Sequence, residues 1–238
     1  MRLHRCVLQV AVGVAAFVAY SHASGQAAQK ALPDTLEQRV VACGICHGKS
    51  GEGTGARDYY PRLAGKPARY LYTQLVNFRD GRRKYPQMVY LLRYMPDEYL
   101  REIADYYARL APPYPRPSSA PASRREIDRG EALAMKGDPD KKIPACTACH
   151  GQALNGMQPA IPGLLGLHAD YIAAQLGGWK TTTRVATAPD CMFDIVSRMS
   201  GDDIAAVAKW LASRPGMVTP PARESAHPLP LTCGSQSN

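Results

Sequence analysis

The chain has 238 residues, is 45% hydrophobic and 21% charged, and carries a formal net charge of +9. This length accommodates two small domains or one of medium size. Beyond the first twenty residues no stretch is apolar enough to cross a bilayer, which excludes a chain with several membrane spans.

The first 23 residues have the layout of a secretory signal peptide. A basic start, MRLHR, precedes an apolar run from Cys6 to Tyr20, and Ser21–Ala23 then offers small residues for cleavage. An uncleaved anchor is the alternative, but the run is short for a membrane span. We therefore expect cleavage after residue 23 and a mature chain that is soluble in the periplasm.

The mature chain is basic, and the excess charge is uneven. Residues 24–117 have a net charge of +6, whereas residues 118–238 have +1. Because an exported protein rarely meets nucleic acid, this balance favours an acidic protein partner or simply a solvated surface. The densest basic cluster is expected to dock that partner and comprises Arg79, Arg82, Arg83 and Lys84.

The mature sequence contains an internal repeat. VACGICHGK at 41–49 recurs as PACTACHGQ at 144–152, and two longer blocks recur at nearly the same offset. These block pairs are residues 61–78 with 162–179, and residues 88–110 with 192–214. The offset varies only between 101 and 104 positions, as expected for two copies of one fold with small differences in loop length.

The elements of both copies read as helices. Residues 34–46 and 125–137 resemble opening helices, and the apolar positions after residues 96 and 200 recur with a helical period. No hairpin signal or sustained alternation indicates a sheet, so the predicted class is all-α. Five prolines between residues 111 and 123 predict a stiff linker. The expected organisation is a first domain at 24–110, that linker, a second domain at 124–214 and a tail at 215–238.

Each copy contains one Cys-x-x-Cys-His motif, the attachment signature of haem c. Cys43 and Cys46, like Cys146 and Cys149, are spaced to lie on one side of a helical turn. Both thiols of a pair can form thioethers with the porphyrin, and the following histidine can bind the iron. The alternatives are a shared zinc site and two redox disulfides, but neither requires a histidine after each pair. We therefore predict two covalently bound haem c groups, with His47 and His150 as iron ligands.

The chain resembles the dihaem cytochrome c4 family in both Cys-x-x-Cys-His-Gly motifs, both Pro-x-Leu-x-Gly blocks and the helix after each repeated methionine. The resemblance covers roughly residues 34–214. It implies two tandem class I cytochrome c domains, each wrapped around one haem, that pass electrons in the periplasm. It also implies that the carbonyls of Pro61 and Pro162 accept hydrogen bonds from the rings of His47 and His150.

A methionine is the expected second axial ligand of each haem. Two pairs recur at one offset, Met88 with Met192 and Met95 with Met199. The family pattern places the ligand a short loop before the final helix, which favours Met88 and Met192, while Met95 and Met199 suit a packing role. With both axial positions of the iron filled, the expected chemistry is one-electron transfer without catalysis.

Three functions remain compatible with this reading. The first is a shuttle between a membrane cytochrome complex and a terminal oxidase or reductase, with loose membrane association. The second is the electron-accepting subunit of a periplasmic dehydrogenase. The third is a dihaem enzyme, such as a peroxidase or a thiosulfate-oxidising cytochrome, and it would require an open or cysteine-ligated haem.

Two cysteines have no counterpart in the first copy. Cys191 aligns with Gln87, and Cys233 lies in the tail, which the first copy lacks. In an oxidising compartment we expect them to form a disulfide that holds the tail beside Met192. Free thiols, an intermolecular disulfide and a Cys191 iron ligand are the alternatives.

Overall fold

The computed structural model describes residues 34–54, 60–117, 121–216 and 228–236, and residues 34–238 form one compact unit. The expected signal peptide at 1–23 therefore lies outside the described residues. The described part of the chain is mainly helical, as predicted. None of its helices combines the length and the apolar character that a bilayer span requires.

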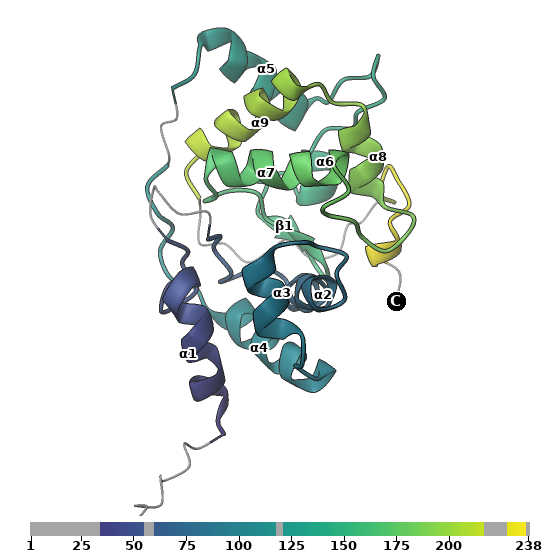
Figure 1. The fold of residues 1–238 in the computed structure, drawn as a ribbon. Coiled ribbons are helices and arrows are strands. Elements are labelled where there is room, and N and C mark those ends of the chain that lie inside the picture. Colours follow the sequence, from purple (N-terminus) through teal and green to yellow (C-terminus); the bar gives the residue numbers. More distant parts are fainter. Residues whose placement is uncertain (1–33, 55–59, 118–120, 217–227, 237–238) are drawn as a thin grey trace, which may run out of the picture. The chain divides into compact units, whose positions relative to one another are not determined.

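The described residues up to residue 110, which we call the first half, form the helices α1 (Leu36–His47), α2 (Ala68–Arg79), α3 (Pro86–Leu92) and α4 (Asp97–Arg109) (Figure 1). Thr35 caps α1 through its side chain, and Pro86 occupies the first turn of α3. Leu100, Ile103 and Tyr107 of α4 are buried, at the spacing that places them on one face.

The second half contains α5 (Arg124–Met135), α6 (Thr147–His150), β1 (Gly156–Met157), β2 (Ile161–Pro162), α7 (Ala169–Lys180), α8 (Cys191–Ser197) and α9 (Gly201–Ser213), and η1 (Gly234–Gln236) lies in the tail. A capping box of Ser200 and Asp203 begins α9, and Ser123 with Glu126 forms another at α5. The antiparallel pair β1–β2 was not predicted, because two residues per strand leave no alternation to detect.

The two halves repeat one order of elements, with one difference near the cysteine motifs. Helices α2, α3 and α4 correspond in sequence to α7, α8 and α9. The first motif forms the end of the long helix α1, whereas the second lies on the separate short helix α6. The insertion between α5 and α6 contains a tight turn closed by Asp138 and Ile143, whose backbones pair.

The core of the second half is a single cluster built mainly from α5, α7 and α9, with Trp179 and Trp210 among its buried residues. Helix α5 packs against α9 (Figure 1), and Gly130 lies at this contact. A β-carbon added there would lie 2.3 Å from the carbonyl oxygen of Ala206 and 2.6 Å from Cβ of Trp210. Only glycine lets the two helices approach this closely.

Backbone and side-chain hydrogen bonds join the two halves. The backbones of Arg83 and Arg184 form an antiparallel bridge, in which Lys84 N donates to Thr183 O at 2.7 Å and Val185 N to Arg82 O at 2.8 Å.

The proline-rich segment is also fixed to the first half. The guanidinium group of Arg62 donates to the carbonyls of Pro112 and Pro113 and stacks on Tyr114.

Candidate haem-binding sites

Both Cys-x-x-Cys-His motifs lie at the C-terminal end of a helix. Cys43, Cys46 and His47 form the last turn of α1, while Cys149 and His150 end α6 with Cys146 as its N-cap. All four cysteines are partly buried, and none is bonded to another cysteine. Each pair therefore remains available for two thioether bonds on one side of a helical turn.

The glycine after each histidine turns the chain back over the ring. Gly48 and Gly151 both have φ of 84°, in the region that glycine adopts without strain. This turn brings Nδ1 of His47 to 2.9 Å from the carbonyl oxygen of Pro61, and Nδ1 of His150 to 2.7 Å from that of Pro162. With Nδ1 donating to a carbonyl, Nε2 is left with a lone pair for a metal ion.

The surroundings of both histidines favour the neutral ring that binds iron. Burial lowers the pKa of His47 and of His150, and the proline carbonyls oppose this shift only in part. Burial also raises the pKa of the Cys146 thiol to about 11, and the pKa values of Cys43 and Cys149 are raised for the same reason. Without a bound group, the thiols of Cys43, Cys146 and Cys149 are therefore protonated at neutral pH.

A largely apolar pocket lies over the second motif. Its lining includes Cys146, Cys149 and His150 on one side and Met192 and Met199 from the segment before α9. Apolar side chains from α5, α7 and α9 complete the lining, among them Leu133, Ile172, Trp179, Val207 and Leu211. Paired thiols, a neutral imidazole and thioethers around an apolar space are the groups that fit a haem c.

Part of the polar lining of this pocket comes from the first half. Lys66 donates from Nζ to the carbonyl oxygen of Gly163 at 3.0 Å, and Tyr70 and Gln74 line the same pocket. Sequence reasoning assigned no role to these residues. A signal was present, because tyrosine and glutamine recur in the second half as Tyr171 and Gln175.

Exposed apolar side chains flank the first site. The ring of His47 is buried and contacts Tyr60 edge to face, with ring centroids 6.2 Å apart. Val41 and Ile45 of α1 and Tyr90 and Leu91 of α3 are exposed. These apolar side chains lie on the two helices that carry His47 and Met88, where an apolar group or a protein partner can cover them.

Both proposed methionine ligands lie on short helices instead of loops. Met88 is in α3 and packs against the cluster of Phe78, Leu92 and Leu100, and Met192 is in α8. Pro86 in the first turn of α3 and the side-chain cap Asp190 of α8 are the local signals that begin these two helices.

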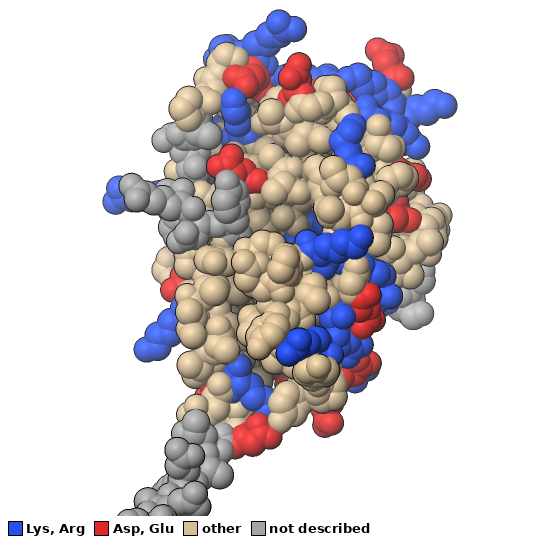
Figure 2. Space-filling model, viewed as in Figure 1, with Lys and Arg blue, Asp and Glu red and all other residues tan. Residues whose placement is uncertain are grey.

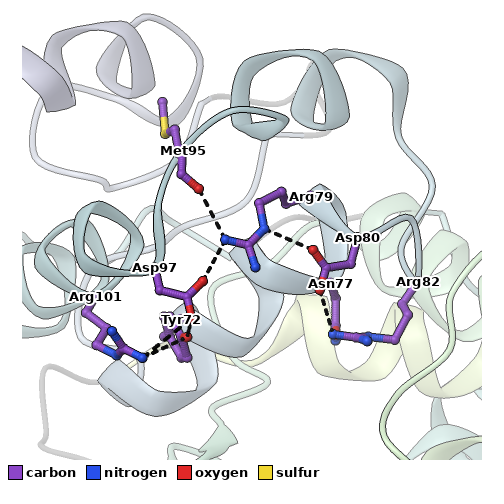
Figure 3. A network of polar contacts seen from close by, with 8 residues as sticks. All are labelled: Tyr72, Asn77, Arg79, Asp80, Arg82, Met95, Asp97 and Arg101. Carbon is purple, nitrogen blue, oxygen red and sulfur yellow. Dashed lines mark hydrogen bonds and ion pairs between the residues drawn. The ribbon is translucent and has the colours of Figure 1, made fainter.

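In the basic cluster before Met88, three arginines have side-chain partners within the protein, whereas Lys84 is exposed. Arg79 pairs with Asp80 and Asp97, and Arg82 pairs with Asp80 and donates to Asn77 (Figure 3). Arg83 is only 8% exposed and points into the contact between the halves. Acidic and basic side chains are also interspersed on the face shown in Figure 2. The sequence gives the number of charges but not their partners.

Cys191 and Cys233 are joined by a disulfide in the structure, with their Cα atoms 5.1 Å apart. Cys191 is the first residue of α8, directly before Met192, and Cys233 lies just before η1 in the tail. Both cysteines line the pocket over the second motif. In this arrangement Cys191 has no thiolate to offer to iron.

Known proteins resemble this chain over most of its length, although no family model matches it. The thiosulfate dehydrogenase electron acceptor of Thiomonas intermedia is 39% identical over 179 residues, which span 74% of this chain and 80% of that protein. Cytochrome c4 of Pseudomonas aeruginosa is 33% identical over 193 residues, spanning 80% of this chain and 90% of that protein. The chain belongs to the dihaem cytochrome c4 family.

Solved structures agree with this assignment. Reduced cytochrome c4 of Pseudomonas stutzeri superimposes with a TM-score of 0.63 at 29% identity, over 75% of this chain and 96% of that one. A thiosulfate dehydrogenase of Marichromatium purpuratum gives a TM-score of 0.63 at 33% identity, over 73% of this chain but 36% of that one. The fold is that of tandem class I cytochrome c domains, the cofactors are two covalent haem c groups, and the function is electron transfer.

Proposed function

We propose that this cytochrome accepts electrons in the periplasm from a dehydrogenase that oxidises thiosulfate. The observation that carries the proposal is the 39% identity to a protein named as the electron acceptor of such an enzyme. The second haem pocket adds to it, because its lining joins a neutral histidine and methionine thioethers around an apolar space. That ligand chemistry suits a carrier with a relatively high reduction potential.

The site residues have distinct roles in this proposal. Each haem c, when bound, supplies a one-electron Fe(III)/Fe(II) couple. Cys43 with Cys46, and Cys146 with Cys149, attach the two haems. His47 and His150 bind iron through Nε2, because their Nδ1 atoms are held by Pro61 and Pro162. Met88 and Met192 would supply the second protein ligand of each iron, and no position would then be left where peroxide or oxygen can bind.

The chain is a carrier and not an enzyme in this proposal. The dihaem-enzyme alternative requires an open iron or a cysteine ligand. Cys191 was the candidate for such a ligand, and its sulfur is bonded to Cys233. The relatives also carry the names of a cytochrome and of an electron acceptor.

The domain limits and the location belong to the same proposal. Residues 1–23 act as a cleaved signal peptide, residues 24–110 and 124–214 form the two haem domains, and residues 111–123 link them. The bonds of Arg62 to Pro112 and Pro113 support a linker that is fixed against the first domain. The tail at 215–238 extends the second domain through Cys233.

Stopped-flow mixing tests the proposed donor. The oxidised cytochrome is mixed with purified thiosulfate dehydrogenase, with or without thiosulfate, and ferrous haem is followed by its visible absorption. We expect haem reduction only when enzyme and thiosulfate are both present, with both haems reduced at the end. Failure of the cytochrome to be reduced by an enzyme that does reduce ferricyanide would reject this donor.

A respiratory shuttle is the second candidate, supported by the 33% identity to cytochrome c4 of Pseudomonas aeruginosa. It predicts that the native protein purifies alone and that the reduced form is oxidised by membranes containing a terminal oxidase. The dehydrogenase proposal instead predicts that a second polypeptide chain co-purifies with the cytochrome.

A further inference from the structure

An exposed aromatic surface lies on the outward side of α3. Its four members, which we call the α3 patch, are Tyr90, Leu91, Arg93 and Tyr94. Tyr90 is 65%, Leu91 45% and Tyr94 84% exposed. The two tyrosines are four positions apart, the spacing of neighbours on one helical face. Large apolar side chains exposed together on one short helix mark a contact surface.

The inward side of α3 is occupied by other residues. Leu92 is buried, and Met88 packs against the same apolar cluster. Tyr90 is two positions after Met88, and Tyr94 is two positions after Leu92, which places the tyrosines on the opposite side of the chain. The α3 patch therefore faces away from the proposed ligand Met88 while lying on the helix that carries it.

Arg93 gives the patch a positive charge. Its guanidinium carbon lies 4.4 Å from the ring centroid of Tyr90 and 4.7 Å from that of Tyr94. Among the described residues it forms no ion pair with a carboxylate. The ring contacts orient the guanidinium group but do not neutralise it. The complement of this patch is an apolar surface that carries a carboxylate.

The second copy shows that the fold does not require this patch. At the offset of the repeated methionines, the equivalent residues on and just after α8 are Asp194, Ile195, Ser197 and Arg198. Three of these four residues are polar, and the isoleucine packs against the core of the second half. The same helix thus forms in the second copy without exposed tyrosines, so a structural requirement does not explain them.

The two copies also differ in what the chain places beside each site. The tail lines the pocket over the second motif with Leu229 and Leu231. It is fixed there by the disulfide of Cys233 and by a hydrogen bond of 2.8 Å from Gly234 N to Pro189 O. The first copy is followed by the linker and has no such tail. The chain supplies its own cover at the second site and an exposed aromatic surface at the first.

The charge of the patch selects its occupant. A symmetric contact between two copies of this chain would bring two Arg93 side chains into one patch, where they repel each other. Residues 24–33 contain no acidic residue and cannot neutralise Arg93 either. Tyrosine and arginine are enriched among the residues that contribute most to protein–protein binding. A different protein with an acidic group on an apolar surface fits the patch.

We propose that the α3 patch is the docking surface for the dehydrogenase that donates electrons, and that a carboxylate of the enzyme pairs with Arg93. This inference rests on the proposed function. At each encounter the enzyme loses one electron, and one haem iron changes from Fe(III) to Fe(II). Because α3 carries Met88, the docked enzyme lies beside the haem attached at Cys43 and Cys46.

Stopped-flow reduction by purified thiosulfate dehydrogenase with thiosulfate tests the patch. The double variant Tyr90→Asp, Tyr94→Arg carries the residues of the second copy and keeps the net charge. Its second-order rate constant should be about tenfold lower than that of the wild type. Phe193→Ser, which removes an exposed aromatic side chain from α8, is the matched control and should react like the wild type.

Three kinetic outcomes are distinct. Reduction by ascorbate, which requires no docking, should be equally fast in all variants. An unchanged rate with the enzyme in the double variant, or a loss confined to Phe193→Ser, would overturn the proposal. If the enzyme fails to reduce even the wild type, the proposed electron donor is wrong, which is a different result from a wild type and a double variant that react alike.

The charge of Arg93 is tested by the salt dependence of the same reaction. Rising ionic strength should slow the wild type, and Arg93→Gln should flatten this dependence, whereas Arg93→Lys should retain it. Arg124→Gln is the charge-matched control, because the Arg124 side chain is 90% exposed on α5. Equal salt slopes for Arg93→Gln and Arg124→Gln would rule out the carboxylate partner.

Two measurements do not depend on how the variants fold. Hydroxyl-radical footprinting of the wild type, alone and with the enzyme, should show protection of Tyr90 and Tyr94 but not of Phe193. Unprotected tyrosines in a mixture where the enzyme reduces the cytochrome would overturn the proposal. Sedimentation of the wild type tests the remaining occupant, because a dimer in which these tyrosines are protected without enzyme would assign the patch to a second copy of the chain.

Discussion

At the scale of single residues, two methionines compete for the position of iron ligand in the second site. Met192 and Met199 both line the second pocket, so proximity alone does not choose between them. Met199 is 6% exposed and lies directly before the α9 cap, where its carbonyl accepts a hydrogen bond from Lys180. These contacts fit a packing residue, and we therefore keep Met192 as the proposed ligand.

Replacing Met88 or Met192 by alanine should leave the iron of one of the two haems without its methionine ligand. We expect each variant to lose about half of the weak methionine–iron absorption band of the oxidised protein and to bind one carbon monoxide per chain when reduced. Met95→Ala and Met199→Ala are the matched controls and should retain the full band. The reverse pattern would assign the ligands to Met95 and Met199.

Asp203 is a buried carboxylate whose effect on stability depends on pH. Burial opposes its charge, but hydrogen bonds from Arg129, Lys141 and the Ser200 cap outweigh burial and hold its pKa below the usual range. A lowered folded-state pKa stabilises the protein above the unfolded pKa of about 4, and this contribution is lost as the pH falls further.

Asp203→Asn should therefore lower the free energy of unfolding at pH 7 by roughly 1–3 kcal/mol. The difference from the wild type should shrink below about pH 4, because the unfolded wild-type carboxylate becomes protonated there. Urea unfolding at pH 7 and pH 3 measures both effects. The exposed neighbour Asp202, replaced by asparagine, serves as the control. If the difference in unfolding free energy between this variant and the wild type does not change with pH, the charge of Asp203 does not cause it.

At the scale of elements, the crossing of α5 and α9 depends on one glycine. A methyl group on Gly130 would overlap the carbonyl of Ala206, so Gly130→Ala should push the helices apart at a cost of about 1–3 kcal/mol. Gly177, in α7, has no atom within 4 Å of an added β-carbon. Gly177→Ala should therefore raise the melting temperature slightly. The melting temperatures of the two variants are measured by thermal unfolding. If both glycines can be replaced by alanine with the same change in melting temperature, α5 and α9 are not close-packed at Gly130.

The disulfide fixes the tail to the first residue of α8. It closes a loop with a sequence separation of 42, which stabilises the folded state by about 3–4 kcal/mol on the chain-entropy model. The double variant Cys191→Ser, Cys233→Ser should unfold at lower denaturant concentration and show a weaker methionine–iron band from Met192. A reducing agent should also lower the denaturant concentration at which the wild type unfolds. It should leave that of the double variant unchanged. Alkylation of two thiols without prior reduction would disprove the bond.

At the scale of the whole molecule, the repeat made most of the fold predictable. Cysteine motifs, prolines and methionines at nearly constant offsets predicted two helical copies, and α2 to α4 and α7 to α9 follow that order. The sequence could not place Arg83, because a basic residue in a charged segment reads as exposed. Its burial depends on Tyr171 and Gln175, about ninety residues later. Contacts between copies are set by geometry, which a repeat pattern does not encode.

The central claim is that one chain carries two closed haems that exchange single electrons. A spectroelectrochemical titration of the purified wild-type protein tests it most directly, combined with the methionine–iron band of the oxidised form and carbon monoxide addition to the reduced form. We expect two electrons per chain, a band of two-haem intensity and no carbon monoxide adduct. Uptake of one electron, or a haem that binds carbon monoxide in the wild type, would contradict it.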